Sequence, residues 1–337
     1  MAGDEPDTQL RCDLVLEGGG VKGIALVGVL DVLEERGYAV RRVAGTSAGA
    51  VVGALVAAGV PRDERLALLR DMDWRQFQDE SRLDRLPGGR VASLLLEQGV
   101  YEGEFLRRWL AEQLDRRGVH TFADLALEDP GAAPAEPAAL RSRLLVMASD
   151  VSAGRLRTLP DDCDAMGCGD ASAMRVVDAV RASMSIPFFY EPARLPGTDG
   201  HDRVLVDGGM LSNFPVSVFD RTDGRAPRWP TFGVKLSARP GAQAPRNPVE
   251  GVLDLTKAMI STMTGFFDQM HLDDASVLAR TVFVDTFDVK ATDFDLDRAA
   301  SQRLYDEGRR SGERFLDDWD FDAYVAQHRA AAVGART

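Results

Sequence analysis

Ser47 stands at the centre of a Gly-x-Ser-x-Gly pentapeptide, a pattern typical of nucleophilic serines. This chemistry needs a sharp turn between a strand and a helix, so that the hydroxyl projects from a strained backbone. Gly45 and Gly49 are small enough to let the strand and the helix approach each other closely. The helix that follows would place its positive end near a developing negative charge. We therefore predict Ser47 as a nucleophile, although a motif this short also occurs by chance.

Gly18, Gly19 and Gly20 follow an apolar segment directly, and Lys22 and Gly23 continue the run. Successive glycine amides can converge on one oxygen atom, as an oxyanion hole requires. A nucleotide-binding turn uses similar geometry. That alternative is disfavoured, because the second predicted strand ends without an acidic residue and no Ser or Thr follows Lys22. The glycine run therefore predicts an oxyanion hole.

Asp207, followed by Gly208 and Gly209, comes directly after the apolar residues 204–206. An acid in this place can face a catalytic cleft, or it can simply bond the backbone of its own turn. If Asp207 is the base for Ser47, the two side chains must lie close together in space although they are 160 residues apart in the sequence. This requires both strands to end at the same edge of a sheet.

Histidines offer a second arrangement. The chain order Ser47, Asp207, His271 is that of an α/β-hydrolase triad. However, His271 is predicted at the end of a long helix, and His201 lies in a Gly/Asp-rich loop where it is expected to face solvent. The triad stays open as the alternative to a Ser–Asp pair.

The elements that must position these groups form two strand–turn–helix units at the start of the chain, which predicts a parallel sheet covered by helices. No repeat or linker divides the sequence, so residues 12–330 are predicted to form one domain after a disordered N-terminus at 1–11. Its motif-bearing part is 12–236 and its helical C-terminal part is 248–330. The predicted strands are 12–17, 40–44, 144–149, 154–159, 203–206, 231–236 and 281–285, and the main predicted helices are 21–36, 48–58, 249–271 and 298–319.

Composition narrows the class of partner. The net charge of −13 argues against a nucleic-acid partner, but a lipid substrate remains open because apolar surface can drive docking. The N-terminus shows no targeting segment and no apolar run is long enough to span a membrane, so a cytoplasmic location is expected. Cys163 and Cys168 are expected to be exposed loop cysteines without a role. No metal and no cofactor are predicted.

The combination of the glycine turn, the Ser47 motif and the Asp207-Gly208-Gly209 motif resembles the patatin-like phospholipases. Residues 181–189 and 208–215 also resemble segments of that family, and the resemblance covers about 12–236. It implies a three-layer α/β/α fold with a mostly parallel mixed sheet. It also implies a dyad in which Ser47 attacks the ester carbonyl and Asp207 takes its proton and later activates water. Lys22 matches the basic position of the family's glycine motif, where we expect a structural or electrostatic role.

We therefore expect an enzyme that hydrolyses acyl esters of phospholipids or lysophospholipids, with transient contact with a membrane surface. The alternatives are a lipid acyltransferase and a signal-regulated lipase effector or scaffold whose site is latent. Residues 253–270 are predicted to form an apolar helix that either packs in the core or covers an acyl chain. The sequence leaves the head group, acyl position, chain length and oligomeric state open.

Overall fold

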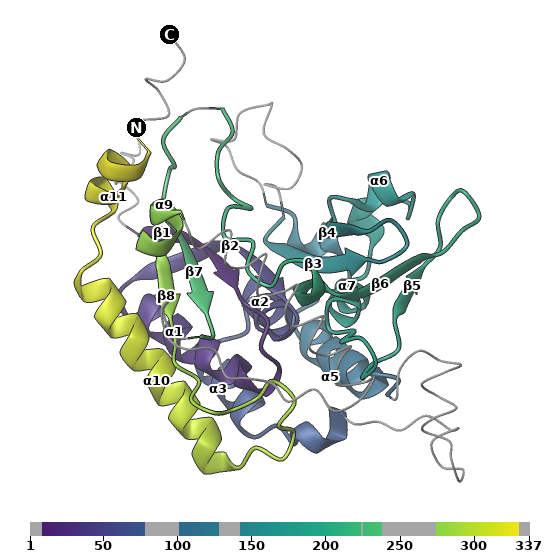
Figure 1. Cartoon of the computed structure of the whole chain (residues 1–337), viewed down its shortest axis with the longest axis horizontal. Helices are drawn as coiled ribbons and strands as arrows, with labels where there is room; N and C mark the ends of the chain where they lie inside the picture. Colours follow the sequence, from purple (N-terminus) through teal and green to yellow (C-terminus); the bar gives the residue numbers. More distant parts are fainter. Residues whose placement is uncertain (1–8, 78–100, 128–141, 224, 238–273, 330–337) are drawn as a thin grey trace, which may run out of the picture.

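The computed structural model describes residues 9–77, 101–127, 142–223, 225–237 and 274–329, and these build one sheet with helices on both sides (Figure 1). The strands are β1 (Leu10–Leu16), β2 (Tyr38–Thr46), β3 (Leu144–Asp150), β4 (Arg155–Leu159), β5 (Ala193–Leu195), β6 (Arg203–Asp207), β7 (Thr231–Lys235) and β8 (Thr281–Phe283). They follow the order β5-β6-β3-β2-β1-β7-β8, with β4 also paired to β3. Strands β3, β2, β1, β7 and β8 are parallel, whereas β4, β5 and β6 make antiparallel pairs. The predicted mostly parallel mixed sheet is thus confirmed.

The register of β3 explains how the sheet is assembled around its centre. Strand β4 pairs with residues 146–150 of β3, so it occupies one edge of that strand. The opposite edge is shared, because β2 pairs with residues 144–147 and β6 with residues 148–150. Since β2 is parallel and β6 antiparallel to β3, their carboxyl ends face each other along this edge.

The helices are α1 (Ile24–Glu35), α2 (Ala48–Ala57), α3 (Arg62–Arg70), α5 (Glu104–Asp115), α6 (Cys163–Met166), α7 (Val176–Ser183), α9 (Ala275–Ala279), α10 (Arg298–Asp317) and α11 (Phe321–His328). Helix α10 runs along α1 on the outside of the molecule (Figure 1). Gly28 and Gly308 let these two helices touch, because a Cβ at either position would collide with the backbone of the other helix.

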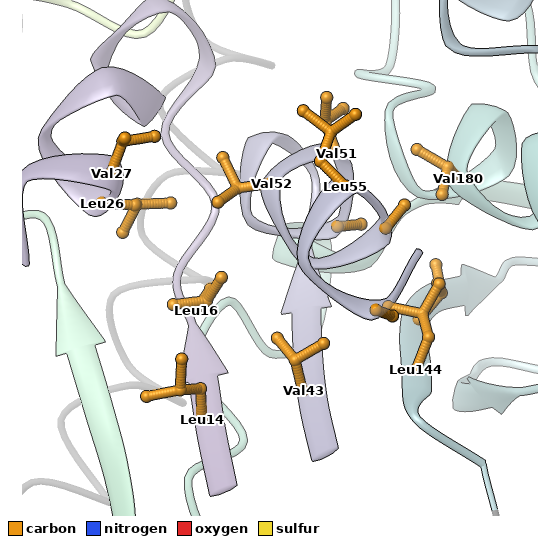
Figure 2. Close-up of a cluster of buried hydrophobic side chains, with 14 of the residues drawn as sticks. Leu14, Leu16, Leu26, Val27, Val43, Val51, Val52, Leu55, Leu144 and Val180 are labelled. Atoms are coloured by element: carbon orange, nitrogen blue, oxygen red, sulfur yellow. The ribbon is translucent and has the colours of Figure 1, made fainter. Parts of the chain in front are cut away.

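Alternating side chains of the strands build a core on each face of the sheet. Leu14, Leu16 and Val43 point to the larger core, which contains side chains of α1, α2, α7 and α10. Figure 2 shows Val51, Val52 and Leu55 of α2 packed over strands β1, β2 and β3. Val15, Ala44 and Met147 point to the other face, against the segment after β6 and against α9. The sheet is therefore buried on both sides, as a parallel sheet requires.

Cys163, expected to be exposed, is buried, because residues 163–166 form one helical turn that places its thiol against Met174; both Cys163 and Cys168 are free thiols. The predicted helix at 249–271, with its apolar stretch 253–270, lies outside the described residues. Within the parts of the chain that are described, no helix has the length and apolar character needed to cross a membrane.

Candidate active site

Ser47 occupies a strained elbow between β2 and α2. Its φ of 53° and ψ of −124° put a non-glycine residue in a region that L side chains rarely adopt, a strain often found at functional sites. The surrounding small residues permit the tight turn. A Cβ at Gly45 would lie 2.3 Å from the carbonyl oxygen of Gly49, and a Cβ at Gly49 would lie 2.3 Å from the carbonyl oxygen of Leu16. The elbow thus presents the Ser47 hydroxyl at the N-terminus of α2.

The glycine turn lies directly against this elbow. A Cβ at Gly18 would stand 3.0 Å from the Cβ of Ser47, and Gly23 touches Ala48 at the start of α2. The amides of Gly18, Gly19 and Gly20 are buried and donate to no acceptor within the described residues. Buried amides without a partner are costly unless a ligand uses them. The turn can therefore offer N–H groups to an oxygen beside Ser47.

Asp207, at the end of β6, lies close enough to the Ser47 side chain for that side chain to lower the pKa of its carboxyl, whereas the Ser47 Oγ donates to the Met184 sulfur at 3.4 Å. Its Oδ1 also accepts the Gly209 amide at 2.8 Å, so the bond within its own turn is present as well. Burial raises the pKa of Asp207 to about 6, although the hydrogen bonds from Ser47 and Gly209 lower it in part. Gly208 rests on the backbone of Met147 in β3. A carboxylate with this pKa, in contact with a serine hydroxyl, can accept its proton near neutral pH.

The direction of β6 differs from the expectation that both strands run to the same edge. Thr46 pairs with Met147, and Asp207 pairs with the next residue of β3, Ala148. Strands β2 and β6 therefore meet end to end on one edge of β3, and this head-on arrangement brings Asp207 to Ser47.

Ser183, Met184 and Ser185, at the C-terminal end of α7, connect the two side chains. Their role was not predicted from the sequence. The Ser183 hydroxyl accepts the Ser47 amide at 2.9 Å and donates to the carbonyl of Met147 at 2.6 Å. The Met184 sulfur lies 3.4 Å from the Ser47 Oγ, and the Ser185 carbonyl accepts the Asp207 amide at 2.8 Å. These contacts fix Ser47 and Asp207 relative to each other. The matching segment 181–189 in the sequence was the available signal.

The back of the glycine turn is held by polar contacts. The Asn213 Nδ2 donates to the Gly18 carbonyl at 3.0 Å, which ties the segment after Asp207 to the turn. Glu17 forms a buried ion pair with Lys235 and accepts the Leu236 amide, which ties the turn to β7. Burial lowers the pKa of Lys22, and the charge of Lys235 also lowers it, whereas that of Glu17 raises it. Lys22 thus lies behind the turn, in a position that fits an electrostatic role.

Histidines and metal ligands are not gathered at this site in the described part of the structure. The His201 side chain is 83% exposed in the loop before β6, as expected, and His271 lies outside the described residues. No group of three His, Cys, Asp or Glu side chains among the described residues could hold a metal ion.

A small apolar pocket adjoins Ser47. Met184, which touches the Ser47 hydroxyl, also lines this pocket together with residues of the glycine turn and of α2. Its wall is completed by residues from α3 and the segment that follows it, namely Leu69, Met72 and Trp74. The pocket holds only about 20 Å³ of free space, so its apolar walls would have to move apart to receive a chain attached to a group that reacts at Ser47.

The sequence model of the patatin-like phospholipase family matches residues 14–220 of the chain. The chain belongs to this family. An uncharacterized protein of Bacillus subtilis, YqhO, is 35% identical over 311 residues, which cover 92% of this chain and 99% of that protein. The patatin-like phospholipase domain-containing protein 6 of Homo sapiens is 29% identical over 206 residues. These residues cover 61% of this chain but only 12% of the human protein.

Among solved structures, VipD from Legionella pneumophila has a similar fold, with a TM-score of 0.51 and 19% sequence identity. The match covers 90% of this chain and 66% of VipD, so the chain spans slightly less than two thirds of that protein. The predicted patatin-like fold is confirmed. Membership of the patatin-like phospholipases indicates a hydrolase that acts on lipids.

Proposed function

We propose that this protein is a serine hydrolase that cleaves acyl esters of phospholipids or lysophospholipids through an acyl-enzyme on Ser47. The observation that carries the proposal is the contact between the buried Asp207 carboxyl and the Ser47 side chain, at a strained elbow beside three unused amides. In the first step, the Ser47 Oγ attacks the ester carbonyl while Asp207 takes its proton, and Asp207 then gives this proton to the alcohol oxygen as the ester C–O bond breaks and the alcohol leaves. In the second, Asp207 activates a water molecule that releases the fatty acid.

The amides of Gly18, Gly19 and Gly20 are proposed to stabilise the negative oxygen of each tetrahedral intermediate. The apolar pocket beside Met184 is proposed to hold the acyl chain, since a buried apolar wall favours a hydrocarbon over a polar substituent. We further propose that residues 12–330 act as one domain. The match to the B. subtilis protein, which spans 99% of that protein, supports this proposal. The test is incubation with defined phospholipids and lysophospholipids, with released fatty acid and any acyl-transfer product read by mass spectrometry.

Replacement of Gly19 by Ala tests the oxyanion hole. We expect turnover to fall by roughly 10²–10³-fold, the effect of losing one oxyanion donor. The φ of −169° at Gly19 suits any residue, but a Cβ there would stand 2.4 Å from the Leu236 side chain and push the turn out of place. Steady-state kinetics on a p-nitrophenyl ester and a thermal unfolding curve give the two readouts. Gly37→Ala is the control: its positive φ costs some stability, yet open space surrounds it far from Ser47. Equal turnover in both variants would contradict the oxyanion role.

Contact with a membrane surface is proposed to involve Phe188 and Phe287, which are 38% and 52% exposed. Both have left-handed backbones, with φ of 67° and 54°, which is rare for a bulky residue. Both belong to loops beyond the carboxyl end of the sheet. Phe188 lies three residues after Ser185, and Phe287 lies in the loop after β8, whose Ala291 rests on the glycine turn. Exposed aromatic rings beside a lipid-cleaving site can enter the interface of a bilayer.

The double variant Phe188→Ser/Phe287→Ser is expected to bind phosphatidylcholine vesicles about tenfold more weakly, because two partly exposed rings no longer leave water. Vesicle sedimentation measures this, and hydrolysis of a soluble short-chain ester should stay unchanged. Leu10→Ser is the control. Leu10 is 49% exposed, but it is the first residue of β1 and therefore lies at the amino end of the strands, opposite to Ser47. The loop at 284–297 carries five aspartates and one lysine, so anionic vesicles should bind less well than neutral ones. Unchanged vesicle binding by the double variant would contradict the proposal.

A further inference from the structure

Met184 lies between Ser47 and the apolar pocket beside it. Its sulfur accepts a hydrogen bond from the Ser47 Oγ at 3.4 Å, and its side chain forms part of the pocket wall. Met184 is buried, with 5% of the residue exposed. One side chain is therefore in contact with both the reacting oxygen and the space next to it.

The bond to Met184 competes with the proposed role of the Ser47 hydroxyl. A serine hydroxyl has a single proton to donate, and here it is directed to the sulfur although the Asp207 carboxyl lies close by. The hydroxyl must leave the sulfur before Asp207 can take its proton. A thioether is a weak acceptor, so this exchange costs little free energy.

The pocket is too small at rest for a hydrocarbon chain. It holds about 20 Å³ of free space, whereas a single water molecule already needs about 10–15 Å³. Part of its wall cannot give way easily, because Val51 and Val52 of α2 are packed over the sheet (Figure 2). Gly20 and Gly23 of the glycine turn form another part of the wall and have no side chain that could move.

Met184 is a part of the wall that can move without disturbing the site. Its backbone is held, because its amide donates to the Val180 carbonyl at 3.0 Å and its neighbours Ser183 and Ser185 make the contacts with the elbow and with β6 described above. Its side chain is unbranched and turns about three bonds, which lets methionine adapt to spaces of different shape. A chain that enters the pocket can therefore displace the thioether alone.

We propose that Met184 determines which acyl chains are cleaved, and that a medium-length chain displaces its side chain from Ser47. Given the proposed cleavage of acyl esters at Ser47, on which this inference rests, the preferred substrates are esters whose acyl chain extends past Ser47 into the pocket. Displacement of the thioether opens space for the chain and frees the Ser47 hydroxyl for Asp207 in one movement. An acetyl group is too short to do this, so acetate esters are cleaved while the sulfur still competes for the hydroxyl.

The test compares p-nitrophenyl acetate with p-nitrophenyl octanoate. In wild type, kcat/KM should be at least about tenfold higher for octanoate, since each additional methylene leaves water. Met184→Leu keeps an apolar side chain of similar volume but removes the sulfur, so kcat/KM for acetate should rise about two- to fivefold. Met184→Ala also removes the wall, so it should raise the octanoate-to-acetate ratio at least about fivefold above that of wild type. A side chain that only stabilised the fold would give lower rates in both variants.

Met174→Ala is the matched control. Met174 is half-buried against the Cys163 sulfur and precedes α7, whereas Met184 follows the last residue of that helix. This variant should keep the wild-type rate on acetate and the wild-type ratio. Thermal unfolding of every variant checks the fold, and if Met184→Ala unfolds below the assay temperature, the acetate rate of Met184→Leu still decides.

Two results would count against the proposal in different ways. If wild type cleaves neither ester better than Ser47→Ala, the proposed function fails and this inference fails with it. If cleavage depends on Ser47 but Met184→Leu does not exceed wild type on acetate, the role of Met184 alone is overturned.

Discussion

Ser47→Ala is expected to lose on the order of 10⁶-fold in kcat, the scale seen when a serine nucleophile is removed from a hydrolase. The Ser183 hydroxyl, which accepts the Ser47 amide and donates to the Met147 carbonyl, is not free to replace it. The substitution keeps the Cβ and the left-handed backbone of the elbow, so the unfolding temperature should change little. Release of fatty acid, followed by mass spectrometry, and labelling by a fluorophosphonate measure the loss.

Ser183→Ala is the matched control for this experiment. It removes a serine hydroxyl that positions the elbow from behind without being the nucleophile. This variant should still be labelled by the fluorophosphonate, but more slowly, because the Ser47 amide loses its acceptor. A Ser47→Ala protein that is still labelled, or that loses only about tenfold in activity, would show that another residue attacks the ester.

Local sequence was sufficient to predict the first half of the site. The spacing of glycines, the apolar segments and the Ser47 motif predicted β1, the glycine turn, β2, the elbow and α2, because each follows from interactions between residues close in the chain. Helix α1 begins at Ile24 rather than at residue 21, since residues 20–23 form a turn of 3₁₀ helix first.

Long-range pairing was the part that local sequence could not predict. The apolar segment before Asp207 looks the same for a strand of either direction, and only the shared edge of β3 makes β6 antiparallel. The family-like segments 181–189 and 208–215 contain Ser183 and Asn213, but the sequence did not reveal their contacts, since each bonds to a residue more than a hundred positions away.

Asp207→Asn is expected to abolish acylation, with a loss on the order of 10⁴-fold or more, because an amide cannot accept the Ser47 proton. Wild-type kcat/KM should rise with pH and level off above about pH 6, since the free enzyme is active only with Asp207 ionised. A fluorogenic ester assayed between pH 4 and pH 9 gives this profile.

Histidine variants distinguish a dyad from a triad. If Asp207 is the base, His201→Ala and His271→Ala should both stay within a few-fold of wild type. If His271 were the base, His271→Ala would be as damaging as Ser47→Ala, and Asp207 would act on an imidazole. The proximity of the Asp207 carboxyl to the Ser47 side chain supports the dyad.

The same Asp207→Asn variant should be more stable than wild type at neutral pH, even though it is inactive. The pKa of Asp207 is about 6 in the folded protein and near 3.8 when unfolded, so the native state holds the proton more tightly. Between these values the unfolded state has released the proton and the native state has not, so rising pH lowers the free energy of unfolding. The full difference corresponds to about 3 kcal/mol above pH 6. Urea unfolding at pH 4.5 and pH 8 should show the variant gaining stability over wild type mainly at pH 8. If the two proteins differed equally in free energy of unfolding at both pH values, burial would not raise the pKa of Asp207. The carboxylate would then be too weak a base for Ser47.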